Sequence, residues 1–148
     1  MSPAWYRFRE RTINFYPPLL GAGIRSRTIG EHTIRIEMKL TILNRNVFGT
    51  HFGGSLYAMC DPWFVLILMR ALDPEYIMWD KVASIQLLHP GRGIMTATFH
   101  ISQQRIAEIR READGGQKIE PRFAVDVLDP HGEATAHVEK LLYVRKKN

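Results

Sequence analysis

Asp61 is the one charged side chain in the otherwise apolar run of residues 53–69. Burying an unpaired carboxylate is costly, so an aspartate in this position needs a local partner. A carboxylate held in such surroundings can activate a water molecule as a general base, or attack an electrophilic carbon itself. Asp61 is therefore the first candidate for chemistry. The alternative is a structural role, in which Asp61 accepts hydrogen bonds at a kink made by Pro62, whose missing amide hydrogen frees an upstream carbonyl.

Gly53 and Gly54 stand at the entry to the same run. Paired glycines allow close backbone approach, and the free amides of a first helical turn can bind an oxyanion or a carbonyl oxygen. The amides of Gly53, Gly54 and Ser55 are therefore the candidate oxyanion hole, unless the glycines only shape a turn. Asp61 follows Gly54 by about two helical turns on the same face, roughly 10 Å along the axis. This separation predicts that one subunit does not complete the site alone.

Length and composition indicate one domain without a membrane segment. The 148 residues, 45% of them hydrophobic, are enough for a single core, so residues 1–148 are interpreted as one domain. No uninterrupted apolar run reaches the roughly 18 residues that indicate a membrane-spanning helix. The N-terminus lacks the apolar stretch and small-residue cleavage site of a signal peptide. We expect a cytoplasmic protein with no membrane insertion.

The cysteine and histidine content and the distribution of charge argue against a disulfide-bonded, metal-binding or nucleic-acid-binding protein. Cys60 is the only cysteine, which excludes an intramolecular disulfide and a cysteine zinc site, and its apolar neighbours indicate a packed thiol. The six histidines show no paired short spacing, so no metal is predicted. The net charge of +5 favours anionic partners in general. The basic residues are scattered without an aromatic-basic repeat, so no nucleic-acid partner is predicted.

Hydrophobic periodicity predicts an antiparallel sheet and one long helix. Apolar residues recur at helical spacing in residues 3–15, and they alternate strictly in residues 33–43, as in a half-buried strand. The apolar run up to Leu72 predicts a helix surrounded by other structure. Further strands are predicted at 21–28, 83–88, 94–101, 118–128 and 134–144, and a short helix from Ser102 to about Gly115. This order predicts an α+β domain in which a curved antiparallel sheet wraps around one long central helix.

The stretch from Asn46 to Gly54, followed by Asp61, and the order of elements resemble the hotdog-fold acyl-CoA thioesterases. The Phe-Gly-Gly form is similar to a branch catalogued as a domain of unknown function and related to the phenylacetate-pathway thioesterases. Those thioesterases carry His-Gly-Gly, whereas this chain has Phe52 there and His51 one position earlier. His51 is therefore not assigned the family histidine's role of ordering the thioester carbonyl. The resemblance implies that Asn46 orients the substrate and that Asp61 is the catalytic carboxylate.

The resemblance also implies a homodimer or homotetramer, with substrate in the subunit interface and Asp61 of one subunit facing the Gly53-Gly54 turn of another. Coenzyme A would be part of the substrate, and no separate cofactor is expected. Arg92, in a glycine-rich turn, is the preferred candidate for the coenzyme's phosphates, and Lys81 is a further one. Other basic candidates are Arg105, Arg110 and Arg111. The predicted helix offers apolar and aromatic side chains for an acyl pocket or for the core: Tyr57, Met59, Trp63, Phe64 and Met69.

The favoured function is hydrolysis of an acyl-CoA thioester, with Asp61 as general base or nucleophile at a subunit interface. The alternative is a non-catalytic hotdog protein that binds acyl-CoA or a fatty acyl group, supported by Phe52 in place of the histidine. A nucleic-acid-binding domain is a weaker third hypothesis. The candidate catalytic residues are Asp61, Asn46, Gly54 and Ser55, and the candidate substrate-binding residues are Gly53, Phe52, His51, Tyr57, Arg92 and Lys81.

Overall fold

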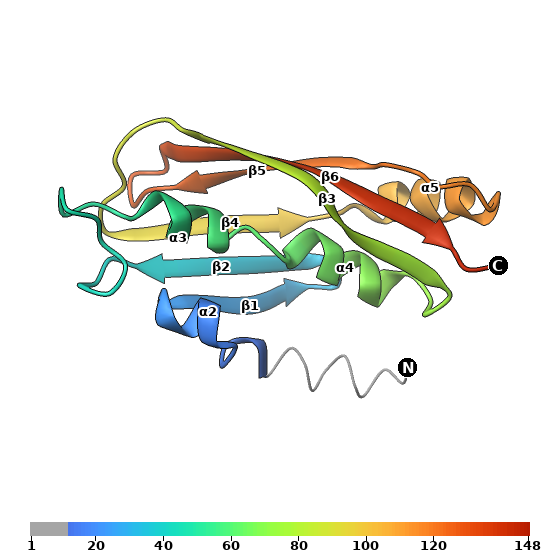
Figure 1. The fold of residues 1–148 in the computed structure, drawn as a ribbon, viewed down its shortest axis with the longest axis horizontal. Helices are drawn as coiled ribbons and strands as arrows, with labels where there is room; N and C mark the ends of the chain where they lie inside the picture. Colours follow the sequence, from blue (N-terminus) through green and yellow to red (C-terminus); the bar gives the residue numbers. More distant parts are fainter. Residues whose placement is uncertain (1–11) are drawn as a thin grey trace.

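A computed structural model describes residues 12–148 as a six-stranded antiparallel sheet with helices packed on it (Figure 1). The strand order is β1-β2-β4-β5-β6-β3. The strands are β1 (Ile24–Gly30), β2 (Thr33–Lys39), β3 (Tyr76–Leu87), β4 (Ile94–His100), β5 (Arg122–Leu128) and β6 (Ala134–Lys146). The helices are α2 (Pro17–Gly21), α3 (Gly53–Ala58), α4 (Trp63–Ala71) and α5 (Gln103–Asp114). No helix in this part of the chain is long and apolar enough to cross a membrane.

The start of the described chain leads into the sheet through a short helix. The helix predicted at residues 3–15 lies largely outside the described residues, of which residues 12 and 13 are helical. Helix α2 then begins at Pro17, a position where the missing amide hydrogen of proline costs nothing. Its Leu19 is buried, so α2 is anchored beside β1.

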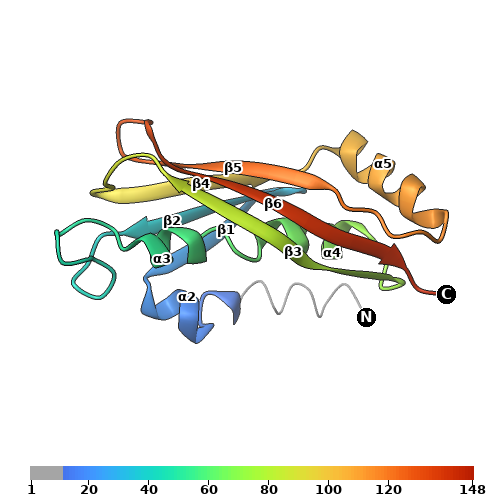
Figure 2. The same cartoon turned by 45° about the horizontal axis from the view of Figure 1, so that its top comes forward.

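Helices α3 and α4 lie along one face of the curved sheet, as Figures 1 and 2 show from two directions. Helix α4 buries Trp63 and Phe64 in the core. The Phe64 ring meets Phe99 of β4 edge-on at 5.0 Å and stacks on Phe123 of β5 at 4.9 Å, both between ring centroids. Aromatic pairs in these geometries stabilise a core beyond the area that they bury. The predicted α+β class, with a curved sheet wrapped around a helical core, is confirmed.

The prediction of one continuous central helix is wrong, because two helices separated by residues 59–62 take its place. Pro62 has no amide hydrogen for the carbonyl four residues earlier, and its ring disfavours a helical residue before it. The amide of Asp61 donates to the Ala58 carbonyl at 3.3 Å, which closes a turn. Asp61 therefore lies in the break between α3 and α4, and not two turns along one straight helix from Gly54.

Two side chains satisfy carbonyls in the helix break. The indole Nε1 of Trp63 donates to the Met59 carbonyl at 2.7 Å. The ammonium of Lys140, in β6, donates to the Asp61 carbonyl. Trp63 is 1% exposed and Met59 is fully buried, so water does not replace the indole. The break is thereby held by α4 on one side and by the sheet on the other.

Strand β2 ends earlier than the alternating pattern predicts. The strand stops at Lys39, whereas the apolar alternation predicts a strand to residue 43. The Asn44 side chain accepts the Thr41 amide at 2.8 Å and donates to the Lys39 carbonyl at 2.7 Å, which turns the chain. Ile42 is consequently 76% exposed and does not reach the predicted inner face.

Strand β3 is longer than predicted, carries a β-bulge and forms one edge of the sheet. It begins at Tyr76, whereas the periodicity predicts a strand only from residue 83. The register against β6 pairs Asp80 with Leu142 and skips the next residue, Lys81. Paired residues share a face of the sheet, and Leu142 is fully buried. The bulge therefore leaves Asp80 on the inner face.

Replacing Trp63 by Phe is expected to lower the free energy of unfolding by about 1–3 kcal/mol, because the Met59 carbonyl would stay buried without its donor. Urea denaturation followed by circular dichroism measures this loss. Trp79→Phe is the matched control, since Trp79 is 46% exposed and its stacking on Tyr143 can be reproduced by a phenyl ring. Equal losses in the two variants would contradict the role given to the buried indole.

Candidate functional site

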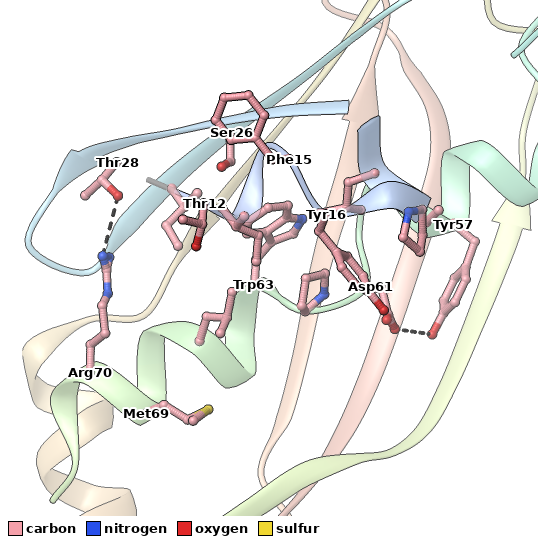
Figure 3. Close-up of a pocket in the computed structure, with 17 residues that line it drawn as sticks. Thr12, Phe15, Tyr16, Ser26, Thr28, Tyr57, Asp61, Trp63, Met69 and Arg70 are labelled. Carbon is pink, nitrogen blue, oxygen red and sulfur yellow. Dashed lines mark hydrogen bonds between the residues drawn. The ribbon is translucent and has the colours of Figure 1, made fainter. Parts of the chain in front are cut away.

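Asp61 lies at the surface of the helix break, with its side chain 54% exposed. Its Oδ1 atom accepts the hydroxyl of Tyr57 at 3.2 Å and the ammonium of Lys140 at 3.3 Å. Figure 3 shows the Tyr57 hydroxyl directed at this carboxylate. Among the described residues no hydrogen bond reaches the other oxygen, Oδ2. One oxygen is therefore held in place while the second is open to water or to a ligand.

Lys140 is a buried cation that the sequence reasoning missed. Its side chain is 0% exposed, and its ammonium donates to the Asp61 carbonyl, to Asp61 Oδ1 at 3.3 Å and to Asp80 Oδ2 at 3.0 Å. An ammonium has three N–H donors, so each donor has an acceptor. A signal was present in the sequence, because Lys140 stands in phase with the inward apolar residues of β6. Those residues are Ala136, Val138, Leu142 and Val144.

Burial and charge set the protonation of the groups around this cation. Burial, reinforced by the nearby Asp61 charge, raises the pKa of Tyr57 to about 12, so its phenol stays protonated and donates to Asp61 at neutral pH. Burial raises the pKa of Cys60 to about 12 as well, which leaves a packed thiol rather than a nucleophile. Burial also raises the pKa of Asp80, against the opposing effect of its hydrogen bond to Lys140.

A pocket of about 900 Å³ opens beside Asp61 (Figure 3). Its wall is mostly apolar and comes from the helix break, α4, the segment before β1, and the first two strands. Of the side chains predicted for an acyl pocket, Tyr57, Trp63 and Met69 line it, whereas Met59 and Phe64 belong to the core. The remaining lining residues are Thr12, Ile13, Phe15, Tyr16, Pro18, Leu19, Ser26, Thr28, Ile34, Ala58, Pro62, Leu66 and Arg70.

The other predicted site residues gather at the opposite end of α3. Asn46, His51, Gly53 and Arg92 line a second pocket of about 410 Å³. Asp61 is not among its lining residues. A single chain therefore places the carboxylate and the glycine turn in separate pockets.

Several polar groups in this second pocket already make hydrogen bonds, within one loop or between the two loops that line it. The Asn46 side chain accepts the amides of Phe48 at 2.9 Å and Thr50 at 3.1 Å, so it stabilises the loop after β2. Arg92 donates from Nη1 to the Gly49 carbonyl at 3.2 Å. His51 is buried, and its Nε2 lies 2.8 Å from the Gly93 carbonyl.

The glycine turn offers two amides rather than the three predicted. The Ser55 amide donates to the Phe52 carbonyl at 3.0 Å, so it is not free. The amides of Gly53 and Gly54 make no hydrogen bond with the described residues. A Cβ atom at Gly54 would come within 2.5 Å of the Phe52 ring, so glycine is required there while the ring keeps its position. Phe52 itself is 56% exposed.

Two further groups of residues lie apart from the Asp61 pocket. Lys81, a predicted phosphate ligand, forms an ion pair with Glu120 and lines neither pocket. His89, Asp129 and Glu133, which sequence spacing does not connect, have potential metal-ligand atoms all within 4.8 Å of one another. Asp129 also accepts the His131 and Glu133 amides, which stabilises the turn before β6. This trio could hold a metal ion; His89 also lines the second pocket, whereas none of the three residues lines the Asp61 pocket.

The fold is similar to those of solved proteins described as thioesterases. The Pseudomonas aeruginosa protein PA5026, of unknown function and described as a probable thioesterase, matches with a TM-score of 0.85 and 18% identity over 99% of this chain and 97% of that one. Haemophilus influenzae thioesterase HI1161 matches with a TM-score of 0.68 and 15% identity over 91% and 87%. The E. coli PaaI protein from the phenylacetic acid degradation operon matches with a TM-score of 0.65 and 15% identity over 99% and 97%.

These similarities, at low identity, establish the fold alone: the chain has the hotdog fold predicted from the order of its elements and the Asn46–Asp61 stretch. The sequence model of the family described as "Domain of unknown function (DUF4442)" matches residues 6–144. The chain belongs to that family. No curated protein sequence matches it.

Two histidines give opposite pH dependences of stability. Burial lowers the pKa of His51, so the folded protein binds fewer protons there than the unfolded chain does. The contribution of His51 to the free energy of unfolding is present above about pH 6.5 and is lost as the pH falls. The hydrogen bond with Asp126 raises the pKa of His137. Its contribution is present below about pH 6.5 and is lost as the pH rises.

His51→Gln is therefore expected to reduce the loss of unfolding free energy between about pH 7.5 and pH 5.5, by at most about 1.4 kcal/mol per pH unit. His137→Gln is the matched control and should increase that loss. Urea denaturation at a series of pH values gives both slopes. The same change of slope in both variants would contradict the assignment of opposite pKa shifts.

Proposed function

We propose that the protein is an acyl-CoA thioesterase of the cytoplasm, active as a homo-oligomer, with Asp61 as its catalytic carboxylate. The observation that carries this proposal is the carboxylate at the mouth of an apolar pocket, with Oδ1 held by Lys140 and Tyr57 and Oδ2 open. A carboxylate arranged in this way is accessible to a substrate and resists rotation. It therefore suits a reaction in which one oxygen must stay aligned with a carbonyl carbon.

Two routes fit this geometry. In the first, Oδ2 of Asp61 takes a proton from water while the water oxygen attacks the thioester carbonyl carbon. The carbon–sulfur bond then breaks, and the proton passes to the coenzyme A thiolate. In the second, Oδ2 attacks the carbonyl carbon itself and expels the thiolate, and water then hydrolyses the resulting anhydride to restore the carboxylate.

The two pockets support a division of the substrate between them. The apolar pocket beside Asp61 suits the acyl chain. The pocket at the other end of α3 offers the Gly53 amide for the carbonyl oxygen, with the free Gly54 amide next to it in the chain, and the Arg92 guanidinium for a phosphate. In the proposed assembly, Asp61 of one subunit meets the glycine turn of a second copy.

Edge strand β3 supports assembly with a second copy. Its outer side has no partner strand in the described chain. Trp79, Val82 and Leu87 expose about half of their surface along this strand. A long, apolar edge strand is a template for pairing with another chain. A homodimer through β3, or a homotetramer made of two such dimers, would cover it.

The second candidate function is acyl-CoA or fatty-acyl binding without turnover. Phe52 stands where the related thioesterases have a histidine, and the Asn46 side chain is occupied by hydrogen bonds within its own loop. Both observations remove polar groups that could order the thioester. The apolar pocket would remain as a binding site.

Asp61→Asn is expected to reduce kcat for acyl-CoA hydrolysis by about 100-fold or more, because the amide neither accepts the proton nor attacks the carbonyl. Released thiol from a panel of short, long and aromatic acyl-CoAs measures the rate. Asp126→Asn, at an exposed carboxylate on β5, is the control and should retain activity. A folded protein that binds the panel without turnover would replace the enzyme proposal by the binding one.

Met69→Trp is expected to raise KM for long-chain acyl-CoAs about tenfold or more, because the larger side chain removes volume from the apolar pocket. Short-chain substrates on the same variant serve as the internal control and should keep their KM. Equal KM changes for short and long chains would contradict the use of this pocket for the acyl group.

A further inference from the structure

The ammonium of Lys140 contacts Asp61 at two points. It donates to the main-chain carbonyl and to Oδ1 of the same residue. At the neighbouring carbonyl in the helix break, that of Met59, one neutral donor from Trp63 is enough. A buried ammonium is therefore more than the backbone of the break requires. The contact to Oδ1 is the part that the backbone does not explain.

The Asp80 carboxylate offsets the free-energy cost of burying the Lys140 ammonium. Burying an ammonium is costly unless an opposite charge and hydrogen bonds compensate for lost solvation. The β-bulge at Lys81 leaves Asp80 on the inner face, where its Oδ2 accepts from Lys140 at 3.0 Å. Its other oxygen, Oδ1, is buried without a hydrogen-bond partner among the described residues. Within residues 12–148, Lys140 is the only charge that compensates this carboxylate at hydrogen-bond distance.

Every segment packed around this point contributes titratable groups. Helix α3 contributes Tyr57, the helix break contributes Cys60 and Asp61, β3 contributes Asp80, and β6 contributes Lys140. The Tyr57 ring also lies beneath the ammonium, whose Nζ is 5.5 Å from the ring centroid. Tyr57 and Lys140 therefore approach Oδ1 of Asp61 together, and neither reaches Oδ2.

We propose that Lys140, paired with Asp80, is a positioning residue that selects Oδ2 of Asp61 as the reacting oxygen. This inference rests on the proposed function, because it assigns Lys140 a role in the same reaction. By holding Oδ1 and the main-chain carbonyl together, the ammonium prevents the carboxylate from exchanging its two oxygens. Charge-assisted hydrogen bonds are strong enough to impose this orientation on a half-exposed side chain.

The experiment measures kcat and KM for acyl-CoA hydrolysis in the wild-type protein and in Lys140→Met, Asp61→Asn and the double variant that combines them. Lys140→Met is expected to lower kcat by about 100-fold with KM changed less than about twofold, because a misplaced reacting group slows the chemical step. In the Asp61→Asn background the same substitution should change kcat by less than about twofold, because Lys140 acts only through Asp61. Lys146→Met, at a more exposed lysine of the same strand, is the control and should retain wild-type kinetics.

A purely structural role of Lys140 would lower kcat by the same factor in both backgrounds, and that result would overturn the inference while leaving the proposed function intact. An unchanged kcat in Lys140→Met would also overturn the inference and leave the proposed function intact. Absence of turnover in the wild-type protein would overturn the proposed function and this inference with it.

If Lys140→Met does not fold, the Asp80→Asn/Lys140→Met variant replaces it, because removing both charges leaves no unpaired buried ion. It should show the same loss of kcat, since Oδ1 of Asp61 still lacks the ammonium donor and keeps only the Tyr57 hydroxyl. Wild-type kcat in this folded variant would overturn the inference.

Discussion

The buried ammonium of Lys140 is the interaction on which this structure depends. It joins β6, edge strand β3 and the break between α3 and α4, three elements far apart in the sequence. A cation with no exposed surface is stable there because its three donors meet three oxygens, two of them on carboxylates. The same contact that holds the helix break to the sheet also orients Asp61. The Lys140 ammonium therefore both stabilises the fold and arranges the candidate site.

The helix break gives the molecule its pocket. A continuous helix would place residue 61 along its own surface, whereas Pro62 ends the regular hydrogen bonding and separates α3 from α4. The core tolerates this interruption because Trp63 satisfies the Met59 carbonyl and because the Phe64 ring is packed between β4 and β5. With α4 anchored in this way, the break stays open at the surface. The apolar pocket and the carboxylate then share one opening.

The division of the candidate site follows from the position of α3. Gly53, at its start, lines one pocket, whereas Tyr57 and Ala58, at its end, line the other together with Asp61. The short helix separates the two groups of functional residues within one chain. The exposed apolar edge at β3 offers the surface through which a second copy would bring them together. Assembly and catalysis are thus linked in the proposed function.

The sequence by itself determined the fold class and the strands with clear alternation, because both depend on local hydrophobic periodicity. It also determined the N-cap of α5 at Ser102 and the choice of Asp61 as a candidate, because each depends on a single residue that differs from its neighbours. Only the tertiary structure decided the rest. The bulge at Lys81 depends on the register between β3 and β6, and the turn that ends β2 is held by Asn44, which also donates to the distant Ala22 carbonyl. The partnership of Asp61, Asp80 and Lys140 joins residues from three separate elements. A lysine in phase with buried apolar residues was visible in β6, but its partners were not, because a charge network is defined by positions in space.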